Sequence, residues 1–359
     1  MSTIEQKLNP VKSITQPGFI LRVQQDSKTV IEIASGAADI EQEAFIDANT
    51  VFHIASLSKQ ITAAAVTHAI MDGLLEIDDD ASHWIPGLKP YKEKITIAHL
   101  IYMTSGLTEY TQVPRKNGMP WSTFHYFSVA EAIEASLSVK ELQFKPGSQW
   151  QYSNINYMLL TEIVATVYKK PFSQVVKEKI FNPLNMHHSL VNDDITTIIP
   201  NRANGYTNRN RENIQMLREH AGIKTHEGED FIQIKRNAPH YGGSGVMTNM
   251  NDWTLWQSEL LNHEVFGHSF WEIMLSPKKF NHHKNNDAFG LVWGDLKGKK
   301  TLWYEGGDID VSSYAISIPD KQLSITCFSN NPNDSCSNKV KLVMEEILLM
   351  VDQSRNPKN

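Results

Sequence analysis

The sequence predicts an α/β protein of the α+β kind, in which an antiparallel sheet is flanked by helices and joined to an inserted all-helical lobe. Strand patterns occupy both ends of the chain, helical patterns fill its middle, and 359 residues suffice for two lobes. We expect residues 1–77 and 231–359 to build the α/β lobe and residues 78–230 to form the helical lobe. Pockets often form between lobes, so we place the active site there.

The N-terminal part contains the first strands and a long helix. Residues 18–35 predict two strands joined by a polar turn at Asp26–Lys28, and residues 50–54 (TVFHI) predict a short buried strand. The apolar spacing and alanine content that follow predict a helix over Ser56–Met71, which stops at Asp72–Gly73.

The middle of the chain is mainly helical. One helix should begin with a capping box of Ser128 and Glu131, and another with Pro171. Residues 205–230 are polar and weakly patterned, which predicts a long excursion or mobile loop. The helical segments are ITIAHLIYMTSG, SVAEAIEASLS, SNINYMLLTEIVATVY and PFSQVVKEKI, the first ending at Gly106.

Strands return in the C-terminal part. Two helical segments, NDWTLWQSELLN and SFWEIMLS, precede them. Alternating apolar residues then predict four successive strands: FGLVWGDL, KKTLWYE, VSSYAISIP and QLSITCFS. A final helix, NKVKLVMEEILLMV, closes the chain.

Composition excludes several classes of partner. The net charge is −6 and there is no dense Lys/Arg run, so we expect neither nucleic acid nor an anionic membrane surface as a partner. No apolar run is long enough for a membrane span. The N-terminus lacks the apolar core of a signal peptide, which predicts a cytoplasmic protein, or a periplasmic or secreted one if a leader has been removed. Cys327 and Cys336 could pair, but two cysteines do not make a disulfide framework.

Ser56 and Lys59 are the strongest candidates for chemistry. They are three residues apart at a predicted helix start, so they share one face near the positive end of the helix dipole. A serine hydroxyl needs an adjacent base, and an amine can serve when burial, here by Ile61–Val66, favours its neutral form. The alternative is an ordinary N-cap serine and a helix-forming lysine. A second Ser-x-x-Lys at Ser276–Lys279 precedes a polar stretch instead of an apolar helix.

Tyr152 and Asn154 form the second candidate element. A Pro-Gly turn places Tyr152 in a loop before a helix, where its phenol could relay protons to a leaving group. The alternative is a tyrosine at the edge of the core and an asparagine that caps the helix. Tyr102 and Tyr110 could line the same cleft or pack in the core.

Metal and phosphate sites are not expected. His263 and His268 are one residue too far apart for the HExxH zinc helix. The Gly-rich segment Gly242–Gly245 lacks the Lys-Ser/Thr of a phosphate loop, and we interpret it as a tight backbone segment near the pocket. We therefore predict no metal and no cofactor.

Taken in order, five segments resemble the serine β-lactamase and penicillin-binding protein superfamily, in the branch of class C β-lactamases, DD-peptidases and esterases. The resemblance covers about residues 17–350. It implies a β-lactamase-like fold and the chemistry of a serine hydrolase. The segments are FHIASLSKQ, LIYMTSGLTEY, FKPGSQWQYSN, YGGSGVMTNMNDW and FGLVWG.

The resemblance implies a role for each motif residue. Ser56 would be the acylated nucleophile, and Lys59 would take its proton, alone or with Tyr152. Tyr152 would relay a proton to the leaving group and later activate water. Asn154 would bind the substrate's acyl-side amide and help to hold Lys59.

The third family motif departs from its usual form. It normally reads Lys-Thr-Gly or His-x-Gly, and here the matching residues are Tyr304, Glu305 and Gly306. Gly306 would let substrate approach the strand, and the Gly307 N–H would join that of Ser56 in an oxyanion hole. A neutral phenol at Tyr304 cannot replace the cation that holds a carboxylate, so we expect poor recognition of carboxylate-bearing β-lactams.

The acids near this motif leave two alternatives open. Glu305, Asp308 and Asp310 could favour a substrate ammonium, or they could form a solvated loop tip.

The leading functional hypothesis is an acyl-enzyme hydrolase with Ser56 as nucleophile, acting on an ester, amide or small peptide. One alternative is a β-lactamase or DD-peptidase. Another is a non-catalytic protein that binds a ligand, a peptide or a cell-wall fragment. The sequence leaves the substrate and the oligomeric state open.

Overall fold

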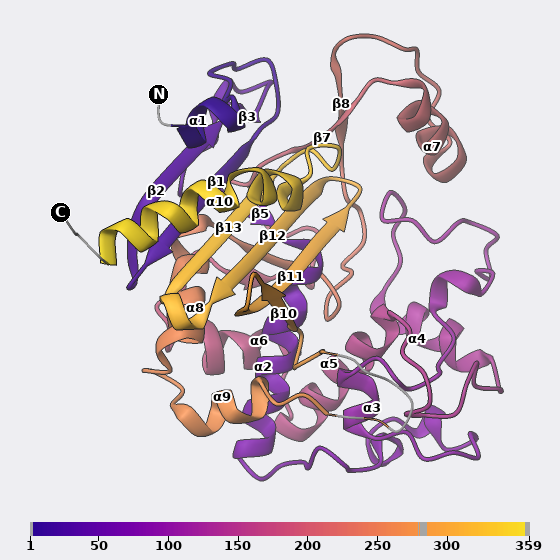
Figure 1. The fold of residues 1–359 in the computed structure, drawn as a ribbon. Helices are drawn as coiled ribbons and strands as arrows, with labels where there is room; N and C mark the ends of the chain where they lie inside the picture. Colours follow the sequence, from indigo (N-terminus) through magenta and orange to yellow (C-terminus); the bar gives the residue numbers. More distant parts are fainter. Residues whose placement is uncertain (1–2, 279, 281–285, 356–359) are drawn as a thin grey trace.

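A six-stranded antiparallel sheet forms the centre of the protein (Figure 1). The computed structural model describes residues 3–278, 280 and 286–355. The N-terminal strand β1 pairs with the last strand β13, Phe19 lying opposite Ser329, so both ends of the chain contribute to the sheet. In sheet order the strands are β10 (Val292–Leu296), β11 (Lys299–Asp308), β12 (Val311–Ile318), β13 (Leu323–Ser329), β1 (Phe19–Gln25) and β2 (Lys28–Ser35).

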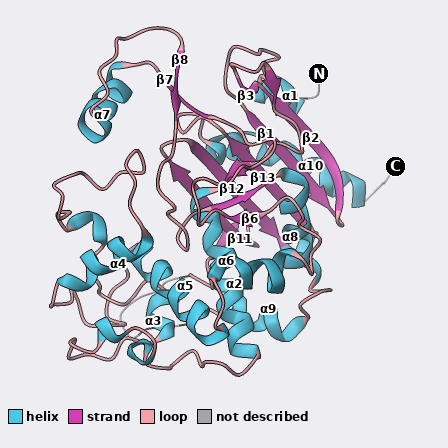
Figure 2. Ribbon diagram, turned by 180° about the vertical axis from the view of Figure 1, so that it is seen from behind, coloured by secondary structure: helices cyan, strands magenta, loops and turns pink. Residues whose placement is uncertain are grey.

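Helices cover both faces of this sheet (Figures 1 and 2). On one face lie α1 (Thr3–Leu8) and α10 (Cys336–Arg355), and on the other α8 (Met250–Asn262) and α2 (Ser58–Met71). β12 shows how the sequence specifies this arrangement, because alternate residues point to opposite faces. Ile316 and Ile318 pack into the apolar cluster beneath α10, whereas the Ser317 hydroxyl donates to Gln257 of α8 at 2.8 Å. Each fully buried Ile side chain stabilises the fold by roughly 1.5–3 kcal/mol.

The middle of the chain is mainly helical and packs below the sheet. Ser128 and Glu131 form the predicted capping box at the start of α4. Pro171 precedes the first residue of its helix instead of occupying it. The helices are α3 (Ile97–Ile101), α4 (Val129–Ser138), α5 (Asn154–Tyr168) and α6 (Phe172–Val176), which continues as a π-turn (Lys177–Phe181), and, later in the chain, α9 (His268–Met274).

Short strands and 3₁₀ turns complete the fold. Two of the strands fall within residues 78–230, so this part of the chain is not entirely helical. The strands are β3 (Ala37–Asp39), β4 (Ala44–Phe45), β5 (Phe52–His53), β6 (Leu190–Val191), β7 (Gly205–Asn208), β8 (Phe231–Ile234) and β9 (Val246–Thr248). The 3₁₀ turns are η1 (Ala55–Leu57), Ala81–His83, Pro86–Leu88, Tyr110–Gln112 and Pro319–Lys321.

The antiparallel sheet and its flanking helices confirm the predicted fold class, whereas two local predictions are wrong. Residues 205–230 are not a long loop, because they contain β7 and the helix α7 (Arg211–Ala221), which Asn210 caps and Gly222 ends at φ 68°. The helix expected to end at Gly106 ends at Ile101, and the chain then turns through Met103 at φ 55°. The division of the chain into lobes stays a prediction.

Two further observations concern the described residues. None of their helices combines the length and apolar character that a membrane span requires. Cys327 and Cys336 are both buried free thiols, and the Cys336 thiol donates to the Ser312 carbonyl.

Buried and partly buried histidines make the stability of this fold sensitive to acid. Burial lowers the pKa of His68 and of His99 to about 4, and it also lowers those of His53 and His240. The unfolded chain therefore binds more protons between pH 6.5 and 4, so stability is complete above pH 6.5 and is lost as the pH falls towards 4. At pH 5 we expect His68 and His99 each to lower the free energy of unfolding by on the order of 1–2 kcal/mol. Urea unfolding at pH 7 and 5 measures this loss.

His68→Gln provides the control for the acid effect. This side chain packs against Phe266 and Phe270, and the substitution removes its titration. The variant should show a smaller difference in unfolding free energy between the two pH values than the unaltered protein. Equal stability of the unaltered protein at pH 5 and 7 would contradict the prediction.

Candidate active site

A strained turn between β5 and α2 presents Ser56. β5 ends at His53, and Ala55 adopts φ 45°, which costs a residue with a side chain of the order of 1–3 kcal/mol. Ser56 follows in the 3₁₀ turn η1, and α2 begins at Ser58. The helix therefore begins two residues later than predicted, and Ser56 lies in the turn just before it.

Ser56, Lys59 and Tyr152 lie in mutual contact. The Ser56 Oγ is 2.6 Å from the Tyr152 Oη and 3.1 Å from the Lys59 Nζ, and Nζ and Oη are 2.6 Å apart. Lys59 is fully buried, whereas Tyr152 is 41% exposed. The structure thus brings Ser56 together with Lys59, which is 3 positions later in the chain, and with Tyr152, which is 96 positions later. One proton can pass between any two of these groups.

The hydrogen bonds of Lys59 define what its nitrogen offers to Ser56. Nζ donates to the Asn154 Oδ1 at 2.9 Å and to the Gly243 carbonyl at 2.6 Å, and these oxygens can only accept. Two N–H bonds are thereby committed. The remaining side of Nζ faces the hydroxyls of Ser56 and Tyr152, with which it also makes hydrogen bonds. This arrangement suits a general base.

Glu109 holds the start of α5 and was not predicted from the sequence. Its Oε2 accepts hydrogen bonds from the Ser153 hydroxyl at 3.0 Å, the Asn154 N–H at 2.8 Å and the Ile155 N–H at 3.3 Å. Burial raises the pKa of Glu109, although these hydrogen bonds and Lys59 oppose the shift. A carboxylate here caps the helix and also fixes the loop that carries Tyr152.

Glu109→Ala should therefore reduce both stability and activity. Loss of the charged cap is expected to cost about 1–3 kcal/mol, and displacement of Tyr152 and Asn154 should lower kcat/KM. Urea unfolding and ester hydrolysis measure the two effects. Glu131→Ala is the matched control, since Glu131 caps α4 through Ser128 and does not line the cavity around Ser56. Glu131→Ala should lower stability without changing kcat/KM. If kcat/KM were unchanged in Glu109→Ala, the proposed role of Glu109 in positioning Tyr152 would be contradicted.

β11 presents part of one edge to Ser56. β10 pairs with β11 only from Lys299 to Trp303, Val292 lying opposite Trp303. Among the described residues, the next stretch, 304–308, therefore has no strand partner on the β10 side. An extended substrate segment could add along such an edge through backbone hydrogen bonds.

Gly306 lies against the turn that carries Ser56. A Cβ at this position would lie 2.3 Å from the Ser313 Oγ, 2.7 Å from the Ile54 carbonyl oxygen and 3.0 Å from the Ser56 nitrogen. Only glycine allows the strand to pack here. Gly307 lines the same cavity as Ser56.

A cavity of about 420 Å³ opens in front of Ser56. The helix α7 covers part of it, because Met216 and His220 of this helix line the cavity. Leu217 holds the helix there by packing with Phe124 and Ile234 in a small separate apolar cluster. Residues 205–230 therefore help to enclose the site. The principal lining residues are Ser56, Tyr152, Asn154, Gly307, Asp308, Tyr110, Trp121, Phe124, Phe127, Met216 and His220.

A second cavity, of about 270 Å³, lies on the other side of Tyr152. Tyr304 is half-buried there, and burial together with the neighbouring Tyr152 raises its pKa well above the ordinary value, so its phenol stays neutral. Glu305 is exposed and lines the same cavity. The substituted third motif thus contributes one neutral and one acidic side chain.

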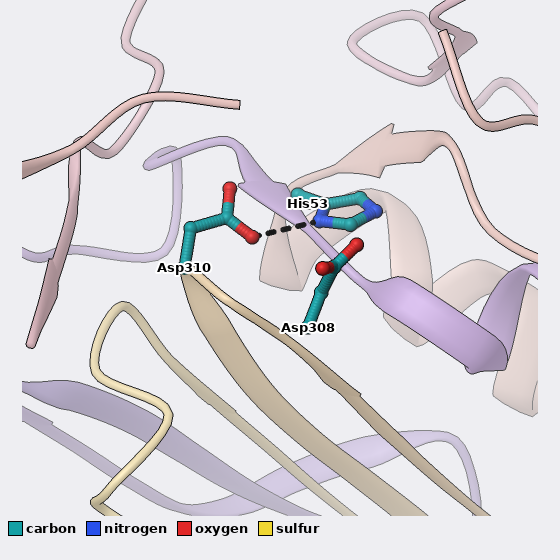
Figure 3. A group of neighbouring side chains, drawn as sticks. All are labelled: His53, Asp308 and Asp310. Atoms are coloured by element: carbon teal, nitrogen blue, oxygen red, sulfur yellow. Dashed lines mark hydrogen bonds and ion pairs between the residues drawn. The ribbon is translucent and has the colours of Figure 1, made fainter. Parts of the chain in front are cut away.

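The remaining acids of this segment are mostly turned inward (Figure 3). Asp310 is buried and contacts the His53 Nδ1 at 3.3 Å, and Asp308 lies half-buried beside the same ring. The prediction that these acids form a solvated loop tip is therefore wrong for Asp310. The ammonium alternative is also weakened for Asp308, because Arg236 Nε lies 3.7 Å from its carboxylate.

His53, Asp308 and Asp310 are arranged closely enough to suggest metal ligands, but arginine charges balance the group. Arg236 donates to the His53 Nε2 at 2.7 Å, which leaves Nδ1 to donate to Asp310. Burial would raise the pKa of Asp310, but His53, Arg236 and Arg202 lower it overall. We assign this network to holding the β11–β12 turn against the strand that precedes Ser56.

Other predicted elements have mixed outcomes. Gly242–Gly245 does lie at the site, through the Gly243 carbonyl. Tyr110 lines the cavity, whereas Tyr102 is buried and donates to the Ser276 carbonyl. The second Ser-x-x-Lys includes Lys279, which lies outside the described residues.

Comparisons with known proteins agree with the resemblance. The profile of the Beta-lactamase family matches residues 9–342. D-aminopeptidase of Gluconobacter oxydans is 22% identical over 88% of this chain and 56% of its own length, and Penicillin-binding protein 4* of Bacillus subtilis is 25% identical over 84% and 65%. The chain thus spans less than two thirds of either relative. D-amino acid amidase from Ochrobactrum anthropi SV3 has the same fold, with a TM-score of 0.78 at 19% identity over 98% of this chain and 99% of that chain.

Proposed function

Because the chain belongs to the beta-lactamase family of serine hydrolases, we propose that it hydrolyses an ester, amide or small peptide through an acyl-enzyme at Ser56. The observation that carries this proposal is the three-way contact of Ser56, Lys59 and Tyr152. The relatives named D-aminopeptidase and D-amino acid amidase support the amide or peptide part of the substrate range.

In acylation, the Ser56 oxygen attacks the substrate carbonyl as its proton leaves. The shortest route runs to the Tyr152 Oη, which Lys59 contacts at 2.6 Å, and the 3.1 Å contact allows direct transfer to Lys59. The N–H groups of Ser56 and Gly307 would stabilise the developing oxyanion. Tyr152 then passes the proton to the leaving oxygen or nitrogen as its bond to carbon breaks.

Deacylation reverses these transfers with water in place of the leaving group. Tyr152, backed by Lys59, takes a proton from water, which attacks the acyl carbon, and Ser56 regains its proton as the acid departs. Asn154 accepts from Lys59 and lines the cavity in front of Ser56, so its amide can also bind the acyl side of the substrate.

A β-lactamase or DD-peptidase activity is the second candidate, favoured by the similarity to Penicillin-binding protein 4*. Tyr304 opposes it, because a neutral phenol supplies no charge to a substrate carboxylate. We expect penicillin to acylate Ser56 poorly and a chromogenic cephalosporin to be hydrolysed slowly. Efficient turnover of the cephalosporin would instead establish the β-lactamase activity.

Labelling with a fluorophosphonate tests the proposed nucleophile. Intact-mass spectrometry should show a single adduct that peptide mapping places on Ser56 and that Ser56→Ala abolishes. A non-catalytic binding protein would remain unlabelled and would bind its ligand equally well in Ser56→Ala. Either no adduct or an adduct that persists in the variant would overturn the proposal.

A further inference from the structure

The second cavity, beside Tyr152, has no role in the steps described above. It lies next to the residue that hands a proton to the leaving group, and Tyr152 lines it together with Tyr304. Its volume, about 270 Å³, is below the roughly 300–1,000 Å³ of sites for drug-sized ligands, so it suits one ring-sized group.

The direction of β11 indicates which part of a substrate reaches this cavity. Gly307 and Asp308 line the larger cavity in front of Ser56, whereas Trp303, Tyr304 and Glu305 line the second one. A substrate along this edge, with its carbonyl oxygen at Gly307, extends one substituent into each cavity. If Asn154, which lines the larger cavity, binds the acyl side as proposed above, the leaving group lies on the Tyr304 side.

Aromatic and aliphatic side chains line the second cavity, and the charged residues described in its lining are acidic. Trp150, Tyr157 and Trp303 line it together with Tyr152 and Tyr304. Among the described lining residues, the carboxyl-bearing side chains are Asp287 and Glu305, and no Lys or Arg is present. Aromatic faces attract both apolar rings and cations, and carboxylates repel an anion while attracting a cation.

We propose that the second cavity is the leaving-group subsite and selects an aromatic alcohol or amine without a carboxylate, with a further preference for a positively charged substituent. This inference rests on the proposed acyl-enzyme mechanism. Cleavage of the carbonyl–oxygen or carbonyl–nitrogen bond releases the leaving group into this cavity as it takes the proton from Tyr152.

Three acetate esters that differ only in the leaving group test the subsite. They are phenyl acetate, 4-carboxyphenyl acetate and 4-(aminomethyl)phenyl acetate, and all form the same acetyl-enzyme. Each kcat/KM is divided by the rate of hydroxide-catalysed hydrolysis of the same ester, which removes differences in chemical reactivity. We expect the carboxylate ester to be at least about 10-fold poorer than phenyl acetate, and the ammonium ester to be the best.

Variants at two positions separate charge from shape. Tyr304→Lys should reduce or reverse the discrimination against the carboxylate ester, whereas Tyr304→Phe, which keeps the ring and its neutrality, should retain it. Glu305→Gln should weaken the preference for the ammonium ester. Because these readouts are ratios within one protein, a general loss of folded enzyme does not imitate them.

The outcomes distinguish this inference from the proposed function. If no ester is cleaved in a Ser56-dependent way, the acyl-enzyme mechanism fails. If all three esters are cleaved with equal normalised kcat/KM, or if the carboxylate ester is preferred, the mechanism stands and the leaving-group assignment is overturned.

Discussion

Ser56→Ala is expected to lower kcat for ester hydrolysis by about 10⁶-fold, the order of loss that removal of a serine nucleophile causes. The substitution deletes one oxygen and leaves the backbone N–H groups of the site in place. Binding of substrate should therefore survive while turnover is lost. Steady-state kinetics with a chromogenic ester, together with equilibrium binding of a non-hydrolysable analogue, separates the two effects.

Ser276→Ala is the matched control, because it alters the second Ser-x-x-Lys of the chain. Ser276 makes hydrogen bonds through its backbone, its carbonyl oxygen accepting from Tyr102 and its N–H donating to the Ile273 carbonyl, and alanine retains both groups. This variant should keep normal kcat. Comparable activity in Ser56→Ala and in the unaltered protein would show that another residue is the nucleophile.

Lys59→Ala should lower kcat by roughly 10²- to 10⁴-fold, the contribution typical of a positioned general base. Removal of the amine also leaves the Asn154 Oδ1 and the Gly243 carbonyl without the donor that Lys59 supplies, so some stability is lost as well. The variant should therefore be examined by urea unfolding before its kinetics are interpreted.

Rescue by small primary amines separates chemistry from structure in Lys59→Ala. The substitution opens space beside Ser56, and added methylamine or ethylamine should restore part of kcat, with a dependence on amine basicity. A residue that only supports the fold would show no such dependence. Failure of every amine to raise kcat in a properly folded variant would count against Lys59 as the base.

The fold was largely predictable because its signals are local. The strands of the sheet show alternating apolar residues, and Ser128 with Glu131 marks the start of α4 before any tertiary contact is known. The helix α7 had similar signals, with Asn210 as cap, Gly222 as stop and Leu217 on its apolar face. The helix was nevertheless missed, because α7 buries only a small apolar cluster and most of the residues around these signals are polar.

The site was predictable only in part, since contact between distant segments decides the rest. Ser56, Lys59 and Tyr152 could be proposed from motif order. Glu109 could not be predicted, because its role depends on hydrogen bonds to the start of α5, some 45 residues later in the chain. The burial of Asp310 likewise depends on how the β11–β12 turn folds against His53.

Trapping the covalent intermediate during turnover tests the central claim most directly. The protein is mixed with 4-nitrophenyl acetate, quenched with acid within the first turnover and digested for peptide mass spectrometry. We predict a single acetyl group on the peptide that contains Ser56, which decays as acetate is released. Hydrolysis of the ester with no acetylated Ser56 at any quench time, or an acetyl group on another residue that forms and decays at the turnover rate, would contradict the account.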